Sequence, residues 1–280
     1  MTKKEEIIGS YKISKFPKDR IPTLDFLAIG DNKHYVKGLV EVDVTNGRQI
    51  INNYEKETSI NISFTAWLLK CIGKAASEFK EVHSLMKGKR KIISFDDVDI
   101  SVPVEREAKG MKIVIPLVIR KTNTKSVKEI HEEIRAAQSE EIDGATVLGE
   151  HSIKKRVNFY TRLPKSIRRF LIKRLLKNPL RAKKLMGTII VTAIGMFGKS
   201  YGWPIPTTSH PLAFAVGGIT KKPGIIDDKI EIREFLTITV LFNHDVVDGA
   251  PATRFINKLN GLIESGYGLK ELFTTSSSNR

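Results

Sequence analysis

Hydrophobic and polar positions alternate in some segments of the chain and recur every three to four residues in others. Short apolar or alternating runs bounded by turn residues are typical of β-strands. Pro116 lies inside one of these runs and favours an edge strand or a bulge there, because proline cannot donate a ladder hydrogen bond. The segments predicted to form strands are residues 35–45, 91–95, 98–104, 112–119, 188–192, 212–216 and 235–242.

Helical spacing of apolar residues appears between these strands. Ser63 precedes the most apolar of the helical segments and is expected to cap a buried helix there. Because helices and strands intermix without a strict βαβ rhythm, we expect one α/β (α+β) domain, a two-layer sandwich in which a mixed sheet packs against helices. The predicted helices cover residues 46–59, 64–79, 127–142 and 164–176, and a last one begins near Ala250.

Charge is the unusual bulk property of this chain. The 280 residues have ordinary contents of hydrophobic (41%) and charged (28%) side chains, but the formal net charge is +16. Thirteen Lys and Arg and no acidic residue lie within residues 153–184, so the remainder carries about +3. The basic character therefore belongs to one segment, called the basic segment below.

The sequence lacks the features that indicate secretion, a membrane span or a metal site. Cys71 is the single cysteine, so no disulfide forms within one chain. The first residues lack the apolar core of a signal peptide, and no run of 18 apolar residues occurs, so we expect a cytoplasmic protein. No metal is expected, because these histidines lack spaced partner ligands: His34, His83, His131, His151 and His210.

A polar motif follows the strand candidate at residues 235–242. Asn243 and His244 end that strand, and Asp248 and Gly249 follow where a helix begins. Histidine suits a general base because its pKa lies near neutrality. The aspartate can anchor the loop or cap the helix, and the glycine permits a tight turn or a close backbone approach. A lone histidine after a strand is more often structural, so the pattern by itself leaves both interpretations open.

The sequence around this motif resembles a known family. Residues 243–259, NHDVVDGAPATRFINKL, are similar to the D-H-R-x-x-D-G-A-x-x-A-R-F-L signature of the catalytic domain of the 2-oxo-acid dehydrogenase acyltransferases. Residues 187–198 resemble the family's G-G-T-F-T-I-S-N-L-G-M-F-G block. Further blocks follow the family's order at residues 63–75, 98–104 and 111–120, and the resemblance extends over roughly residues 33–270.

The resemblance implies a chloramphenicol acetyltransferase-like fold and transfer of an acyl group between coenzyme A and a thiol such as dihydrolipoamide. His244 would be the general base, and Thr192, at the position of the family serine, would donate its hydroxyl to the oxyanion. Asp248 would complete the catalytic site, while Gly249 and Asn243 would shape its loop. Acyl-CoA is then a substrate, and neither a metal nor a lipoyl group on this chain is implied. The family's site lies between subunits, which implies a homotrimer or a multiple of trimers.

The sequence departs from the family pattern in several places. Asn243 and Asp245 replace the aspartate and arginine beside the family histidine, and Thr192 replaces a serine. No lipoyl or peripheral-subunit-binding domain precedes the matching region, so the expected thiol partner is a separate lipoylated carrier protein. Two alternatives stay open: acyl transfer to a small hydroxyl or amine acceptor, and a non-catalytic trimeric scaffold of the same fold.

The resemblance also predicts the domain organisation. We expect an N-terminal extension (1–30), the catalytic domain (31–270) and a disordered tail (271–280). Within the catalytic domain, the basic segment is an amphipathic insertion. His210 lies in the loop Thr-Thr-Ser-His-Pro, beside the expected active-site loop, and is a candidate for substrate contact.

The role of the basic segment stays open at the level of sequence. A helix over residues 164–176 places Ile167, Phe170, Leu171 and Leu175 on one face, with Lys and Arg over much of the rest. It can be a solvated helix packed on its own domain, or an amphipathic helix on an anionic membrane surface. It can also attract coenzyme A or an acidic carrier protein. Nucleic acid is not favoured, because no base-reading motif or aromatic interleaving accompanies the charge.

Overall fold

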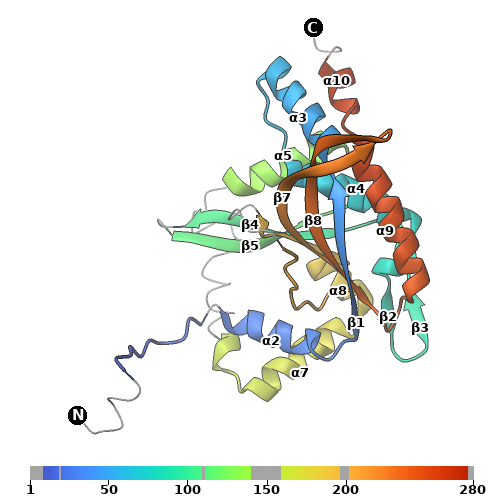
Figure 1. Ribbon diagram of the computed structural model, residues 1–280. Helices are drawn as coiled ribbons and strands as arrows, with labels where there is room; N and C mark the ends of the chain where they lie inside the picture. The colour runs from blue at the N-terminus through green and yellow to red at the C-terminus, as the bar shows by residue number, and fades with distance from the viewer. Residues whose placement is uncertain (1–8, 19, 109–110, 140–158, 196–201, 277–280) are drawn as a thin grey trace.

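A six-stranded mixed sheet forms the centre of the molecule, a computed structural model that describes residues 9–18, 20–108, 111–139, 159–195 and 202–276. The spatial order of the strands is β1-β8-β7-β6-β4-β5 (Figure 1). β6 is parallel to β4 and to β7, and the other neighbouring pairs are antiparallel. The strands are β1 (Tyr35–Asp43), β4 (Ile100–Ala108), β5 (Met111–Ile119), β6 (Ile189–Ala193), β7 (Leu212–Ile226) and β8 (Lys229–Asn243); β2 (Leu85–Lys87) and β3 (Lys91–Ile93) form a separate hairpin.

Helices form the second layer, and one hydrophobic core joins them to the sheet. Trp67 of α4 and Phe255 of α9 are fully buried in this core together with Phe214 and Phe242 of the sheet. This arrangement confirms the predicted two-layer α/β sandwich. The helices of the layer are α3 (Thr45–Thr58), α4 (Phe64–Glu78), α5 (Val127–Ser139) and α9 (Gly249–Glu264), with the short η1 (Lys80–His83) and α10 (Glu271–Ser276) beside them (Figure 1).

Local sequence signals explain several element boundaries. The side chain of Ser63 caps α4 by accepting a hydrogen bond from the N–H of Ala66 at 3.3 Å, as its position predicted. Pro116 lies on the edge strand β5, where the missing N–H interrupts no central ladder. Asp227 and Asp228 both have positive φ values, 47° and 61°, and they join β7 to β8 in the two-residue turn that suits a twisted hairpin.

A second group of helices lies at the end of the sheet remote from α3 and α10: α2 (Arg20–Gly30), α7 (Lys165–Leu176) and α8 (Pro179–Met186) (Figure 1). α2 packs on α7, and the carboxylate of Asp25 is buried between them. It accepts hydrogen bonds from Arg168 Nε at 2.7 Å and from the Tyr160 hydroxyl at 2.9 Å. Burial acts to raise the pKa of Asp25, but these hydrogen bonds outweigh it and hold the pKa below its usual value.

The structure differs from the sequence-based prediction in three segments. α2 is a helix within the predicted N-terminal extension. β7 and β8 run for 15 residues each as one hairpin, well beyond the predicted strands. The predicted disordered tail begins too early, because α10 covers Glu271–Ser276 and the apolar side chain of Leu272 is buried in the core. Residues 277–280 of that tail and residues 153–158 of the basic segment lie outside the described residues.

Among the helices of the described ranges, none is both long enough and apolar enough to cross a bilayer.

Candidate active site

His244 lies immediately after β8, beside the start of β1 and the end of the loop that precedes β7. Its backbone N–H donates to the carbonyl of His34 at 2.7 Å, and the N–H of Asn243 donates to the carbonyl of Pro211 at 2.9 Å. Neighbouring segments therefore fix the backbone that carries the imidazole. The His244 side chain itself is 46% exposed, so a ligand can reach it.

Asp248 occupies the N-cap position of α9 but makes no capping hydrogen bond through its side chain. Its Oδ1 lies 3.8 Å from Nδ1 of His244, and its side chain is exposed. The helix N-terminus favours a carboxylate there, and the carboxylate lies beside the imidazole. Contacts within one chain do not require a glycine at this position, because a Cβ on residue 249 would find open space around it.

Asp245, which stands where the family has arginine, pairs with His34. The Nδ1 of His34 lies 2.8 Å from Oδ1 of Asp245, and the Asp245 N–H donates to Oδ1 of the buried Asn243 at 3.3 Å. Lys33 donates to the Ser209 carbonyl; burial lowers the pKa of Lys33 to about 8, and the charge of Asp245 opposes this shift. Sequence reasoning missed both basic residues, whose only signal is their position just before a predicted strand.

Thr192 lies on β6, and the structure does not bring it to His244 within one chain. Thr192 pairs with Ala215 on β7, which pairs with Thr239 on β8. His244 follows Thr239 by five residues, or roughly 17 Å of extended strand, and two strand spacings add roughly 10 Å across the sheet. A hydroxyl and an imidazole so far apart cannot act on one reacting group from the same subunit.

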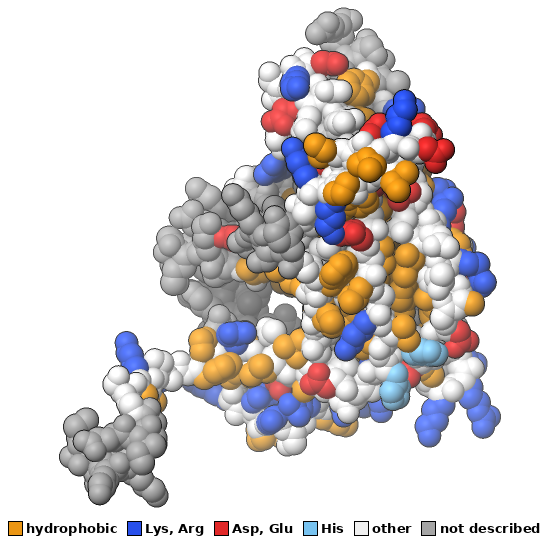
Figure 2. All heavy atoms as spheres, in the orientation of Figure 1, with side chains coloured by type: hydrophobic (Ala, Val, Ile, Leu, Met, Phe, Trp, Pro, Cys, Tyr) orange, Lys and Arg blue, Asp and Glu red, His pale blue; other side chains and the backbone are white. Residues whose placement is uncertain are grey.

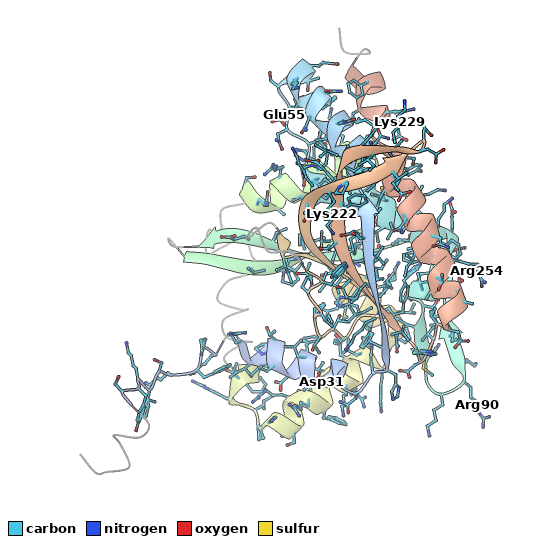
Figure 3. All side chains as sticks on the ribbon, in the orientation of Figure 1. Asp31, Glu55, Arg90, Lys222, Lys229 and Arg254 are labelled. Atoms are coloured by element: carbon cyan, nitrogen blue, oxygen red, sulfur yellow. The ribbon has the colours of Figure 1, made fainter. Side chains whose placement is uncertain are left out.

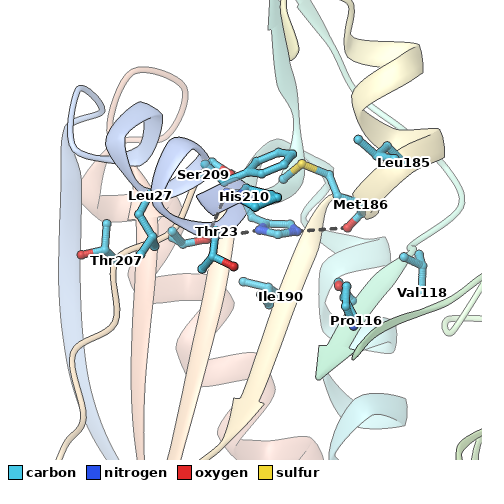
Figure 4. Close-up of a pocket in the computed structure, with 14 residues that line it drawn as sticks. Thr23, Leu27, Pro116, Val118, Leu185, Met186, Ile190, Thr207, Ser209 and His210 are labelled. Atoms are coloured by element: carbon cyan, nitrogen blue, oxygen red, sulfur yellow. Dashed lines mark hydrogen bonds between the residues drawn. The ribbon is translucent and has the colours of Figure 1, made fainter. Parts of the chain in front are cut away.

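His210 is buried in the wall of a cavity (Figure 4). Its Nδ1 lies 3.2 Å from Thr208 Oγ1, and its Nε2 lies 3.0 Å from the Met186 carbonyl oxygen. Because a carbonyl oxygen only accepts, Nε2 carries the proton and Nδ1 accepts from the threonine hydroxyl. Burial lowers the pKa of His210 to about 4, so the ring is neutral near pH 7. Both ring nitrogens are engaged, and contact of this ring with substrate stays a prediction.

The described residues contain neither a metal site nor a reactive thiol. Within those ranges, no three His, Cys, Asp or Glu side chains converge as metal ligands. Cys71 is buried on α4, and burial raises the pKa of its thiol, which keeps the sulfur protonated and unreactive.

Comparisons with known proteins show which family this chain matches. Residues 34–150 and 163–270 match the family described as the 2-oxoacid dehydrogenases acyltransferase catalytic domain. The chain is 26% identical over 233 residues to the lipoamide acyltransferase component of the branched-chain alpha-keto acid dehydrogenase complex of Bacillus subtilis, which covers 81% of this chain and 46% of that protein. The chain thus spans less than half the length of this curated relative.

Solved structures of similar fold include a probable dihydrolipoamide acetyltransferase from Listeria monocytogenes. It has a TM-score of 0.64 and 23% identity, over 93% of this chain and 97% of that chain. The dihydrolipoamide acetyltransferase of Azotobacter vinelandii has a TM-score of 0.61 and 18% identity, over 90% of this chain and 92% of that chain. Both similarities cover nearly the whole folded chain.

Proposed function

The chain belongs to the family of 2-oxoacid dehydrogenase acyltransferase catalytic domains, and from this premise we propose that it moves an acyl group between coenzyme A and a thiol such as dihydrolipoamide. The observation that carries the proposal is the placement of His244. Its half-exposed imidazole sits on a backbone fixed by neighbouring segments, with the Asp248 carboxylate 3.8 Å away. This is the environment that a general base near neutral pH needs.

In the proposed reaction, His244 removes the proton of the acceptor thiol while the sulfur attacks the thioester carbonyl of acyl-CoA. The new C–S bond forms, and the carbonyl electron pair moves to oxygen, where the hydroxyl of Thr192 donates a hydrogen bond. When the intermediate collapses, the C–S bond to coenzyme A breaks and the imidazolium returns its proton to the leaving thiolate. Both substrates are bound together, so proximity supplies much of the rate and no acyl-enzyme forms.

The spacing of residues along the chain supports the roles of Thr192 and Asp248. In the Azotobacter vinelandii enzyme, a serine, a histidine and an asparagine have been investigated for their part in catalysis. Their separations along that chain equal those of Thr192, His244 and Asp248 here. Threonine retains the hydroxyl of serine, and aspartate retains an oxygen that can accept a hydrogen bond.

We propose that the working unit is a homotrimer, or a multiple of trimers, with each site shared between two subunits. The register that keeps Thr192 and His244 apart within one chain supports this. In a cyclic trimer, every His244 can meet the Thr192 of the next subunit through the same interface. The solved structures of similar fold include the cubic core of a pyruvate dehydrogenase multienzyme complex, a larger assembly.

The acceptor is the part of the proposal that an experiment must decide. Wild-type protein is incubated with acyl-CoA and dihydrolipoamide, free or on a lipoylated carrier protein, and with a panel of amines and alcohols. Mass spectrometry then follows the acylated product. Transfer to dihydrolipoamide that His244→Ala abolishes supports the proposal. Transfer only to an amine or alcohol favours the alternative acceptor class, and no transfer from any acyl-CoA refutes catalysis and leaves a scaffold.

The basic segment suggests a second property, peripheral binding to an anionic membrane. Ile172 of α7 is buried against its own domain, while Phe170 is 61% exposed on the opposite side. Ile167 and Arg174 flank it in exposed positions. Figure 2 shows hydrophobic and basic side chains together on the surface at this end of the molecule. Exposed apolar groups with flanking cations are typical of helices that lie in a membrane interface.

Co-sedimentation with vesicles tests this property. Wild-type protein should sediment with phosphatidylglycerol vesicles and not with phosphatidylcholine vesicles, and salt should weaken the binding. The double variant Phe170→Ser, Arg174→Ser should lose it. The control Lys229→Ser, Ile230→Ser removes the same kinds of exposed side chain from the β7–β8 hairpin, where Lys229 lies at the far end of the molecule (Figure 3). Equal loss in both variants, or no vesicle binding, contradicts the proposal.

A further inference from the structure

A cavity of about 450 Å³ lies between α2, α8, the sheet and the loop before β7 (Figure 4). Its sheet side is one row of residues in register: Ser101 on β4 pairs with Val118 on β5 and with Ile190 on β6. α2 and the C-terminal end of α8 form the other walls. The α2 wall lies ahead of the residues that match the family, which begin at 34.

The lining of the cavity suits an apolar ligand. Its largest side chains are hydrophobic: Phe26, Leu27, Val118, Leu185, Met186 and Ile190. The polar lining consists of hydroxyl side chains and the ring of His210, whose two nitrogens are already hydrogen-bonded, to Thr208 and to Met186. None of the lining residues is Lys, Arg, Asp or Glu. A ligand there therefore gains from burying hydrocarbon, and a carboxylate would meet no cationic side chain.

Buried ion pairs hold two walls of the cavity in place. The pairing of Asp25 with Arg168 fixes α2 to α7. Arg120 pairs with the buried Asp99 at 3.0 Å and donates to the carbonyl of Lys183 at 2.9 Å, which fixes α8 to the end of β5. The cavity is thus formed before any ligand binds, which lowers the cost of binding.

The cavity also lies next to the proposed oxyanion donor. Ile190 and Thr192 are two residues apart on β6, so their side chains emerge on the same face of the sheet, about 7 Å apart. A thioester whose carbonyl oxygen is at Thr192 can run its acyl chain back along β6 to Ile190 and into the cavity.

We propose that this cavity binds the acyl chain of the donor, an inference that rests on the proposed function. The substrate class it selects is an uncharged aliphatic acyl-CoA. At roughly 30 Å³ for each methylene, about the volume of a water molecule, chains of up to about 15 carbons fit within about 450 Å³, whereas an acetyl group leaves most of the space unfilled. A charged succinyl group finds no cationic partner among the lining residues.

Two thioethers that cannot be cleaved, S-octyl-CoA and S-methyl-CoA, test the proposal without turnover. Calorimetry should show S-octyl-CoA binding at least about 100-fold more tightly, since each buried methylene is worth up to about fourfold. Thr23→Trp places a large side chain at the exposed rim of the cavity and should reduce this ratio at least about tenfold. Leu24→Trp is the matched control, because Leu24 is the next exposed residue of α2 and lines a neighbouring cavity instead.

The outcomes separate this inference from the proposed function. Equal affinity of the wild-type protein for the two thioethers overturns the inference and needs no variant. The inference is also overturned if Thr23→Trp leaves the ratio of the two affinities unchanged, or if Thr23→Trp and Leu24→Trp reduce that ratio equally. A third result is that the protein binds S-octyl-CoA tightly, loses that binding in Thr23→Trp, and yet transfers no acyl group. That result supports the cavity as a binding site for the acyl chain and refutes the proposed function.

Discussion

Thr192 lies within the central sheet, whereas His244 lies just beyond the end of β8, five residues out of register with it. Thr192 is aligned with Thr239 across β7, and His244 lies five positions further along the chain. A site that uses both residues must therefore combine two subunits. The first prediction follows from this geometry.

Single substitutions at the two positions should each damage catalysis in their own way. His244→Ala is expected to abolish acyl transfer, because the acceptor thiol loses the imidazole that removes its proton. Thr192→Ala is expected to lower kcat about 10²-fold, because the oxyanion loses one donor. Steady-state kinetics with acyl-CoA and dihydrolipoamide measure both effects, and wild-type turnover by His244→Ala would falsify the mechanism.

Mixing the two variants should restore activity. In randomly assembled trimers, about one interface in four pairs an intact His244 with an intact Thr192, so an equal mixture should regain about a quarter of wild-type activity. The variants are unfolded, mixed and refolded together, with each variant refolded alone as the control. A mixture no more active than its better parent would mean that each site is built within one subunit.

The contact of His34 with Asp245 should position the loop that carries His244. An exposed side-chain hydrogen bond of this kind contributes at most about 1 kcal/mol, so Asp245→Asn and His34→Gln should each lower kcat by up to about fivefold with little change in KM. The double variant should be no worse than either single variant, because one contact is lost in all three. Additive losses in this cycle would show that the two residues act independently.

The buried carboxylate of Asp25 should be a stability determinant of the α2–α7 unit. Asp25→Ala removes the partner of Arg168 and should lower the free energy of unfolding by about 3 kcal/mol, as measured by urea denaturation. Asp31→Ala changes an exposed aspartate just after the same helix (Figure 3) and should alter it by less than about 0.5 kcal/mol. Equal effects would contradict the assigned role.

Stability should fall as the pH is lowered from about 6.5 to about 4. Burial lowers the pKa of His83 and of His210 to about 4, whereas an unfolded histidine titrates near 6.5. In this window the unfolded chain binds more protons, so protonation favours unfolding, by up to about 3 kcal/mol for each histidine. Urea denaturation of wild type and His83→Asn across this range should show a shallower slope in the variant. An unchanged slope would assign the effect to carboxylates instead.

Much of the fold follows from local sequence. The helices α3, α4, α5 and α9 and the edge position of β5 were predictable, because helical and strand periodicities and the chemistry of a cap or a proline act between near neighbours. α2 was missed, since it packs on α7, a partner that comes about 140 residues later in the chain. The outer half of the β7–β8 hairpin was also missed, although Ile230 and Ile232 alternate there with charged residues as strand residues do.

The sequence by itself determined the family, the sandwich and the position of His244 at the end of a buried strand. Tertiary structure alone decided that His34 meets Asp245, that Asp25 is buried against Arg168, and that a cavity lies beside Ile190. It also decided the register that separates Thr192 from His244. The physical reason is that local patterns specify elements, whereas register and long-range pairing are set by the burial of groups that lie far apart in the chain.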